Sequence, residues 1–375
     1  MPTISRFAGR FASTPPSLRL SPLLWRPAVV VAMAALAVLV TAGLPAAASA
    51  GAASNGQIAV VATDSTAGLS AITLIPSDRL AINGDSKVLV SGPGTIGNLQ
   101  WTPDGKTLVY DETAGKRTDL YAIDVASPKR RLLAVNLPYG SDGALSPDGN
   151  TVAYWSGSGR SVAVYLVGTD AQSRRKLTGG FDPAWSSDGS RLALLTPTGE
   201  LETIGADGSG AQSVGQLSRT GVVTTLAWAP DGESFLVVTQ DYVNSTTIVE
   251  TISSNATVLH VLSKTGGIPN PWPPAATWSP GGTRLAFTEA FGFDQKAGDH
   301  QSALVATADG SDPHRIDSAT GALQLELSWS PDERSIVTAD GNRVRIVRAA
   351  GTHAKVIAYA GEDDGLDDPA WQPMP

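Results

Sequence analysis

Residues 182–192 read Asp182-Pro-Ala-Trp-Ser-Ser-Asp-Gly-Ser-Arg-Leu192: an apolar run, a turn and the start of a second apolar run. The turn recurs along the chain at spacings of roughly 40–50 residues, which are typical of β-propeller blades. Its copies are Trp101-Thr-Pro-Asp-Gly105, Leu145-Ser-Pro-Asp-Gly149, Trp185-Ser-Ser-Asp-Gly189, Trp228-Ala-Pro-Asp-Gly232, Trp278-Ser-Pro-Gly-Gly282, Trp329-Ser-Pro-Asp-Glu333 and Trp371-Gln-Pro373.

Each copy predicts the first two strands of a four-stranded unit. In the turn, Pro presets φ, the Asp side chain bonds its own backbone and Gly takes a positive φ. A third run such as Leu120–Asp124 and a short fourth run such as Arg131–Leu133 complete the unit. A second apolar run starts at a fixed offset from each signature, at Leu108, Val152, Leu192, Phe235, Leu285 and Ile336.

The two ends of the repeat region complement each other. Gln57–Val61, Ala71–Ile75 and Lys87–Val90 resemble second, third and fourth strands, whereas Asp368-Pro-Ala-Trp371 resembles a first strand with nothing after it. We therefore expect residues 51–375 to form an all-β, seven-bladed β-propeller of four-stranded antiparallel blades. Its ring is closed by pairing of the N-terminal strands with the C-terminal strand, which removes exposed sheet edges.

The repeat resembles a known family. The Pro-Ala-Trp-Ser-Pro-Asp-Gly pattern, with a third strand read as Leu120-Tyr-Ala-Ile-Asp124, looks like the WD40-like repeat of the TolB carboxy-terminal propeller over residues 56–375. Members of that family include periplasmic protein-interaction scaffolds, and related propellers accompany peptidases and some lyases. This chain departs from the pattern with seven expected blades instead of six, and without room for TolB's amino-terminal α/β domain.

Residues 1–50 read as an export segment. Their charges are the arginines Arg6, Arg10, Arg19 and Arg26, followed by an apolar stretch and by Ala48 and Ala50 in A-x-A spacing. This pattern predicts a secretory signal peptide, and the alternative is an uncleaved membrane anchor. In both cases we expect the propeller outside the cytoplasm, either secreted, periplasmic or at the cell envelope, with membrane contact only through an uncleaved segment.

Composition excludes several classes of function. The chain has no Cys, which excludes disulfides and thiol chemistry, and its net charge of −8 argues against nucleic-acid binding. There is no Gly-x-Ser-x-Gly elbow, P-loop or Rossmann fingerprint. The four histidines are His260, His300, His314 and His353, and only His300 is expected in a loop on the ligand face. We therefore expect no metal site of the His-rich kind, no catalytic residue and no cofactor.

The residue three positions before each signature forms a pattern of its own. Around the ring, the consecutive blades carry Glu326, Asp368, Asn98, Asp142 and Asp182, whereas the two remaining blades carry Thr225 and Ala275. The five side chains, of which four are acids, either cap the beginning of a strand or form a polar, mostly acidic arc at the channel mouth that attracts Ca²⁺ or a basic peptide. Repulsion between the acids should raise their pKa values.

Loops near the sixth blade carry aromatic side chains beyond those of the repeat. Trp272, Phe291 and Phe293 are expected on one rim, where they either pack within their own loops or form a binding patch. We expect a monomeric binding module for a protein or peptide. The alternatives are a lyase or glycan hydrolase that uses the acids at the channel mouth, and a sensor for a small ligand or sugar.

Overall fold

The structure, a computed structural model, describes residues 56–81, 85–217, 221–241, 243–244, 246–266, 275–291, 300–320, 325–361 and 364–374. The chain divides into two units, Met1–Ala35 and Leu36–Pro375, and every described residue belongs to the second. The expected export segment lies outside the described residues. Within the described ranges, no helix is long and apolar enough to cross a membrane.

The described residues form seven four-stranded antiparallel sheets arranged as a seven-bladed β-propeller. Blade 1 contains β28 (Asp364–Trp371), β1 (Ile58–Asp64), β2 (Leu69–Ile75) and β3 (Lys87–Gly92). Blade 2 contains β4 (Thr95–Trp101), β5 (Thr107–Ala114), β6 (Arg117–Asp124) and β7 (Arg130–Pro138). Blade 3 contains β8 (Ala144–Leu145), β9 (Thr151–Ser156), β10 (Ala163–Gly168) and β11 (Arg175–Gly179). Blade 4 contains β12 (Phe181–Trp185), β13 (Arg191–Leu195), β14 (Glu200–Gly205) and β15 (Gln212–Gln216). Blade 5 contains β16 (Val222–Trp228), β17 (Ser234–Asp241), β18 (Thr246–Ser253) and β19 (Val258–Gly266). Blade 6 contains β20 (Ala276–Trp278), β21 (Arg284–Phe291), β22 (His300–Thr307) and β23 (His314–Thr320). Blade 7 contains β24 (Glu326–Trp329), β25 (Ser335–Ala339), β26 (Arg343–Arg348) and β27 (Ala354–Tyr359).

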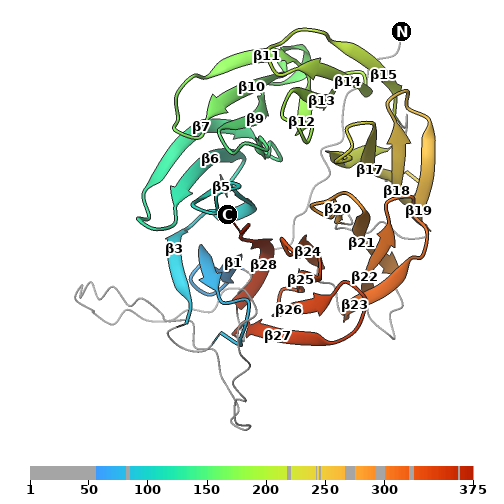
Figure 1. The fold of residues 1–375 in the computed structure, drawn as a ribbon. Helices are drawn as coiled ribbons and strands as arrows, with labels where there is room; N and C mark the ends of the chain where they lie inside the picture. The colour runs from blue at the N-terminus through green and yellow to red at the C-terminus, as the bar shows by residue number, and fades with distance from the viewer. Residues whose placement is uncertain are drawn as a thin grey trace, which may run out of the picture. The chain divides into compact units, whose positions relative to one another are not determined.

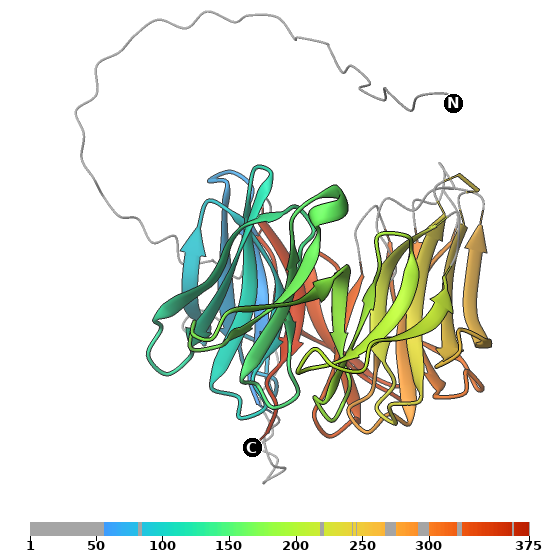
Figure 2. The same ribbon diagram turned by 90° about the horizontal axis from the view of Figure 1, so that it is seen from above.

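The blades surround an axis, with the first strand of each blade inside and the fourth outside. Figure 1 shows β3, β7, β11, β15, β19, β23 and β27 along the outer edge, and β12, β20, β24 and β28 nearer the centre. Figure 2 shows the strands running between two faces. We call the face with the turns between first and second strands the signature face. The axial channel is the space that the first strands enclose.

The ring closes as the sequence predicts. β28 pairs with β1 in antiparallel register, with Ala59 opposite Ala370 and Ile58 opposite Trp371. Two further hydrogen bonds extend the pairing, from the Gln372 N–H to the Gln57 carbonyl and from the Gln57 N–H to Oε1 of Gln372, each at 2.9 Å. The last strand of the chain therefore completes the blade of its first three strands.

The signature turns have the predicted chemistry. Oδ1 of Asp188 accepts hydrogen bonds from the Ser186 hydroxyl at 2.6 Å and from the Ser190 N–H at 3.0 Å. These bonds lower the pKa of Asp188 to about 2. The same pattern occurs at Asp104, Asp148 and Asp332. The φ values are 66° at Gly105, 75° at Gly149, 69° at Gly189 and 74° at Gly232, as predicted for these turns. The hydrogen bonds above show that the signature acids stabilise the turns.

Three of the six signature tryptophans donate a hydrogen bond to the blade before their own, whereas the indole N–H groups of Trp278, Trp329 and Trp371 are buried without a partner among the described residues. The indole N–H of Trp185 donates to the Ala144 carbonyl at 2.9 Å, and those of Trp101 and Trp228 donate to the Ala370 and Ala184 carbonyls at 3.1 Å. Each of these carbonyls lies on the first strand of the preceding blade. The signature tryptophans therefore pack between neighbouring blades.

The outer strands are longer than predicted. β7 runs over Arg130–Pro138, although the sequence indicated only Arg131–Leu133. Backbone pairing with β6 continues to Pro138, whereas Leu132 and Val135 are exposed. Because an outer strand buries little of its surface, its alternation of apolar and polar residues is weak, and its ends cannot be located from that pattern.

Candidate functional site

Three first strands contain β-bulges at predicted site residues. Asn98 in β4, Asp182 in β12 and Asp368 in β28 have φ values of 54°, 51° and 48°, and the pairing register shifts beside each of them. We expected them at the beginnings of strands, but they lie inside. Asp142 precedes β8 and Glu326 begins β24, as expected. A bulge re-aims a side chain within a strand, and Asn and Asp tolerate the left-handed conformation that it needs.

A carboxylate of one blade holds the bulge of the next. The backbone N–H of Asp368 in blade 1 donates to Oε2 of Glu326 in blade 7. Oδ2 of Asp368 accepts a 2.8 Å hydrogen bond from the backbone N–H of Leu99 in blade 2. These contacts tie three consecutive blades together near the axis, so Glu326 and Asp368 have a structural role there.

Amides continue the connection from blade 2 to blade 3. Nδ2 of Asn98 donates to the Gly143 carbonyl at 2.8 Å, and its Oδ1 accepts from Nε2 of Gln100 at 2.9 Å. Oε1 of Gln100 in turn accepts from the Leu145 N–H at 2.9 Å. Asn98 therefore bonds the next blade as its acidic neighbours do, but without adding charge.

Asp142 meets a carboxyl group that the sequence analysis did not single out. Asp111, on β5, is only 7% exposed, and it forms a side-chain hydrogen bond with Asp142, which is itself exposed. Burial raises the pKa of Asp111 to about 8, and the charges of Asp142 and Asp368 add to this effect. Although Asp142 is exposed, the surrounding protein removes part of its hydration, and this desolvation raises its pKa. Two carboxyl groups in such contact share one proton.

The other three acids have raised pKa values as well. Burial is the largest cause at each, and it brings Asp182 and Asp368 to about 6 and Glu326 to about 8. Negative charge from Asp142 contributes at Asp182 and Asp368, and that of Asp368 contributes at Glu326. The predicted direction is confirmed, although repulsion is the smaller cause. We call these five residues, Asp111, Asp142, Asp182, Glu326 and Asp368, the acidic cluster.

No basic side chain is among the main causes of the pKa shifts in the acidic cluster. The leading contributions to these five pKa values come from burial, hydrogen bonds and other carboxyls. A nearby cation in blade 7, Arg345, is already engaged. Its guanidinium contacts Asp317 at 2.9 Å and Asp340 at 3.1 Å, and all three side chains are buried.

The remaining predicted residues do not extend this cluster. Trp272 and Phe293 lie outside the described residues. Phe291 is the last residue of β21 and His300 the first of β22, so both belong to strands and not to the loop we expected, and their side chains are not described. Thr225 lies in β16 and Ala275 just before β20, both half-buried.

A comparison of the blades in the sequence could have identified Asp111 as an unusual residue. Ten residues after the other signatures stand Trp155, Leu195, Val238, Thr288 and Ala339, and strand pairing puts Val61 at the same position in blade 1. Only blade 2 has a charged residue there. An acid at a position that is otherwise apolar or neutral is a departure from the packing pattern of the repeat, and in the structure it faces Asp142.

An open pocket lies in the axial channel toward the signature face. Its volume is about 360 Å³, and its wall contains first-strand residues of four blades and signature-turn residues of three of them. Most of its lining residues are apolar, and polar and apolar atoms contribute about equally to its exposed surface. The wall consists of Leu99, Gln100, Trp101 and Pro103 from blade 2, Leu145, Ser146 and Pro147 from blade 3, Ser328 from blade 7, and Ala370, Trp371 and Pro373 from blade 1 and the chain end. We call it the axial pocket.

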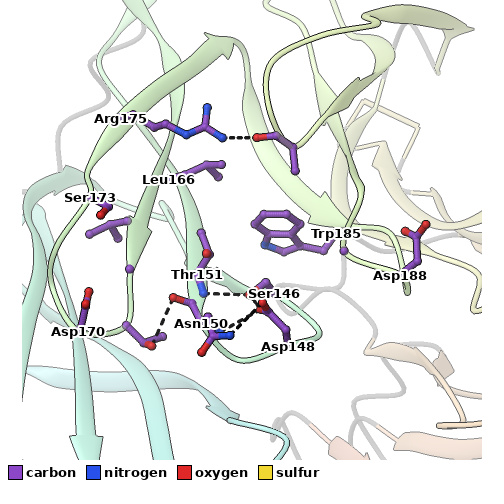
Figure 3. A pocket seen from close by; sticks show the side chains of 15 residues that line it. Ser146, Asp148, Asn150, Thr151, Leu166, Asp170, Ser173, Arg175, Trp185 and Asp188 are labelled. Atoms are coloured by element: carbon purple, nitrogen blue, oxygen red, sulfur yellow. Dashed lines mark hydrogen bonds between the residues drawn. The ribbon is translucent and has the colours of Figure 1, made fainter.

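A second pocket of about 620 Å³ lies between blades 3 and 4. Figure 3 shows Trp185 on one side of it and Asp148, Asn150 and Arg175 around it. Its polar groups are engaged in the fold. Asp148 holds its signature turn through the Ser146 hydroxyl and the Asn150 N–H, and the Arg175 guanidinium donates to the Ala206 carbonyl. This pocket is therefore a weaker candidate than the axial channel.

The arrangement of acids does not form a metal centre. Over the part of the chain that the structure describes, no three His, Asp or Glu side chains are placed to hold a metal ion together. The acidic cluster is spread over blades 7, 1, 2, 3 and 4, and two of its members already accept backbone N–H groups. A positively charged side chain of a peptide, which can reach several of these carboxyls in turn, suits this geometry better than a single metal ion does.

Solved structures share the fold. TolB from Acinetobacter baumannii aligns with a TM-score of 0.53 at 16% identity, over 85% of this chain and 67% of that chain. An oligogalacturonate lyase in complex with manganese aligns with a TM-score of 0.51 at 13% identity, over 83% of this chain and 95% of that chain. A prolyl endopeptidase aligns with a TM-score of 0.53 at 12% identity, over 86% of this chain and 51% of that chain.

These likenesses show a TolB-like β-propeller fold and no more. No family model matches the chain, and no curated protein matches it by sequence. The structures that share the fold include a TolB protein, a lyase and a peptidase, so the fold alone does not select a function. The site of this chain has to be interpreted from its own residues.

Proposed function

We propose that this chain is a non-catalytic binding module, acting outside the cytoplasm, that takes a positively charged segment of a protein or peptide into its axial channel. One observation carries the proposal. The acidic cluster, with Asp142 exposed and Asp111 beside it, lies next to an open pocket whose lining residues are mainly apolar: Asp368 shares β28 with Ala370 and Trp371 of the wall, and Asp142 lies three residues before Leu145. A Lys or Arg side chain supplies the missing charge, and its aliphatic stem suits an apolar wall.

The chemistry of the pair favours a cation over a neutral ligand. At neutral pH the raised pKa of Asp111 keeps a proton in the pair. An ammonium or guanidinium group replaces that proton, so that both carboxyls become charged and accept its N–H groups. Binding therefore releases protons near neutral pH, and it weakens as salt screens the exposed side.

An enzyme of the lyase or glycan-hydrolase type is the alternative, because the pair combines a protonated with an ionised carboxyl. A protein ligand is favoured by the residues around the pair. The carboxylates of Glu326 and Asp368 accept hydrogen bonds from backbone N–H groups of the next blade. These bonds hold the blades together and make the channel wall rigid. The axial pocket contains Trp and Pro side chains, and aromatic residues are enriched in binding interfaces.

Titration calorimetry with a blocked Gly-Lys-Gly peptide tests the proposal, with Gly-Gln-Gly as the uncharged reference. We expect the lysine peptide to bind, to release protons and to bind more weakly at high salt. Asp142→Asn should weaken binding by about tenfold, the loss of one charged hydrogen bond. Asp312→Asn is the matched control, since Asp312 is an exposed acid with a φ of 53° on a turn between outer strands. Equal binding of both peptides, or equal effects of both variants, would contradict the proposal.

A further inference from the structure

One blade departs from the repeat at its signature position. Six blades carry Trp there and blade 3 carries Leu145. The six tryptophans are Trp101, Trp185, Trp228, Trp278, Trp329 and Trp371. The rest of the blade 3 signature is intact, since Gly149 has a φ of 75° and Asp148 bonds Ser146 and Asn150 as in the other turns. The exception therefore concerns only the side chain that packs on the neighbouring blade.

The other blades show what that side chain would do. Each indole with a hydrogen-bonded N–H reaches the preceding blade, at the carbonyl one position before the signature there. Trp185 reaches Ala144 in this way, and Trp228 reaches Ala184. For blade 3, the corresponding carbonyl belongs to Gln100. The missing indole would therefore lie against Gln100 and Trp101, between blades 2 and 3.

The axial pocket occupies that place. Its wall contains Gln100, Trp101 and Pro103 of blade 2 together with Leu145 and Pro147 of blade 3. Trp101 and Leu145 are half-buried, and both prolines are exposed at the rim. The rim between blades 2 and 3 is fixed by the close approach of their signature turns, because a Cβ on Gly149 would lie 2.6 Å from Cδ of Pro103. The fold thus keeps this space open and does not collapse into it.

We propose that the axial pocket is a binding site for an aromatic side chain of a partner protein, above all an indole, which takes the place of the seventh signature tryptophan. The wall supplies Trp101, the exposed prolines Pro103 and Pro147 and, by the contact that Trp101, Trp185 and Trp228 make in their own blades, the Gln100 carbonyl as acceptor for the indole N–H. A pocket of about 360 Å³ is at the lower end of the usual range of roughly 300–1,000 Å³ for ligand sites. That size suits one side chain better than a whole ligand molecule.

This inference adds a second contact to the proposed function and does not depend on the acidic cluster. Asp142 of the acidic cluster lies three residues before Leu145 of the pocket wall. At about 3.3 Å per residue along a strand, the two contacts are on the order of 10 Å apart. A partner segment with a basic residue two or three positions from an aromatic residue would reach both.

The test uses N-acetyl-tryptophanamide as the probe and N-acetyl-leucinamide as its aliphatic reference, followed by amide chemical shifts in the full chain. We expect saturable shifts at Gln100, Trp101 and Leu145, with the leucine compound at least about tenfold weaker. Leu145→Trp should abolish these shifts and leave the melting temperature unchanged or higher, because it restores the contact of the other six blades. Leu145→Phe fills part of the space and serves as a second variant should Leu145→Trp not fold.

Two results would overturn the inference: shifts that persist unchanged in both filled variants, and a probe that shifts no residue of the pocket wall. Asp142→Asn separates this test from that of the proposed function. It should weaken the lysine peptide and leave the uncharged tryptophan compound unaffected, whereas Leu145→Trp should do the reverse. Failure of one site is thereby distinguished from failure of the other.

Discussion

The carboxyl of Asp111 in blade 2 is hydrogen-bonded to the carboxyl of Asp142, which precedes the first strand of blade 3. The contact joins two blades through groups that cannot both be charged without a cation. Blades 2 and 3 already pack through an apolar cluster that includes Val109 and Val152, as blades 5 and 6 do through Leu236 and Leu285. The polar contact therefore has a cost that the fold does not require, and it motivates the predictions below.

The acidic cluster predicts an unusual dependence of stability on pH. A carboxyl whose pKa is raised in the folded state binds more protons there than in the unfolded chain, so its contribution to the free energy of unfolding falls as pH rises. The interval runs from about 4, the ordinary carboxyl value, to about 8 at Asp111 and Glu326. We expect the melting temperature to rise as pH is lowered from about 8 to about 5.

Scanning calorimetry across that interval checks this prediction. Acids with lowered pKa values, such as Asp188 at about 2, lose their stabilising effect only below the interval and do not mask it. Asp111→Asn should flatten the rise, because it removes the group with one of the largest shifts, whereas Asp312→Asn should leave it unchanged. A melting temperature that falls steadily from pH 8 to pH 5 would count against the cluster.

Two signature glycines separate backbone strain from steric contact. Gly149 and Gly189 both have φ near 70°, so replacement by Ala costs about 1–2 kcal/mol in left-handed strain at each. A Cβ at 189 would meet Cδ of Pro147 at an ordinary 3.7 Å, whereas one at 149 would meet Cδ of Pro103 at 2.6 Å. Gly149→Ala should therefore lower the free energy of unfolding by about 1–3 kcal/mol more than Gly189→Ala does, because the added methyl group overpacks the contact. Equal losses in urea unfolding would show that the turns of blades 2 and 3 are not in contact.

Ring closure predicts the effect of shortening the chain. Deletion of residues 367–375 removes most of β28 and leaves β1 as an unpaired edge, which promotes association between molecules. We expect a lower melting temperature, loss of amide protection in β1 and aggregation on size-exclusion chromatography. Deletion of residues 373–375 alone keeps the pairing of Ala370 with Ala59 and is the control. Unchanged protection of β1 in the longer deletion would mean that the blade does not depend on the C-terminal strand.

The repeat made the fold predictable because each signature contains both its strand and its turn. Blade number, closure through Ala370 and the positive φ of Gly105 followed from residue type and spacing, since a Pro-Asp-Gly turn between apolar runs has few alternatives. The acids were placed in the correct blades for the same reason. Their electrostatic effect on one another was predictable in direction, because like charges around one axis disfavour ionisation.

The details of the site depended on features that no local pattern contains. A bulge moves Asp182 and Asp368 inside their strands, and whether a strand bulges depends on its pairing partner. Asp111 lies on a second strand, and its contact with Asp142 arises only when two blades are side by side. The axial pocket likewise requires blades 1, 2, 3 and 7 together, although the Leu145 exception that we connect with it is visible in the sequence.

The most direct test of the proposed cation site is a carbon-detected NMR titration of the Asp111 and Asp142 side-chain carboxyls, with and without the blocked Gly-Lys-Gly peptide. In the free protein we expect an Asp111 midpoint near 8, coupled to a second step at Asp142. With saturating peptide both midpoints should move down by about one unit or more, because the ammonium group stabilises the charged pair. Midpoints near the ordinary aspartate value, or midpoints that the peptide leaves unmoved, would contradict a cation-binding channel.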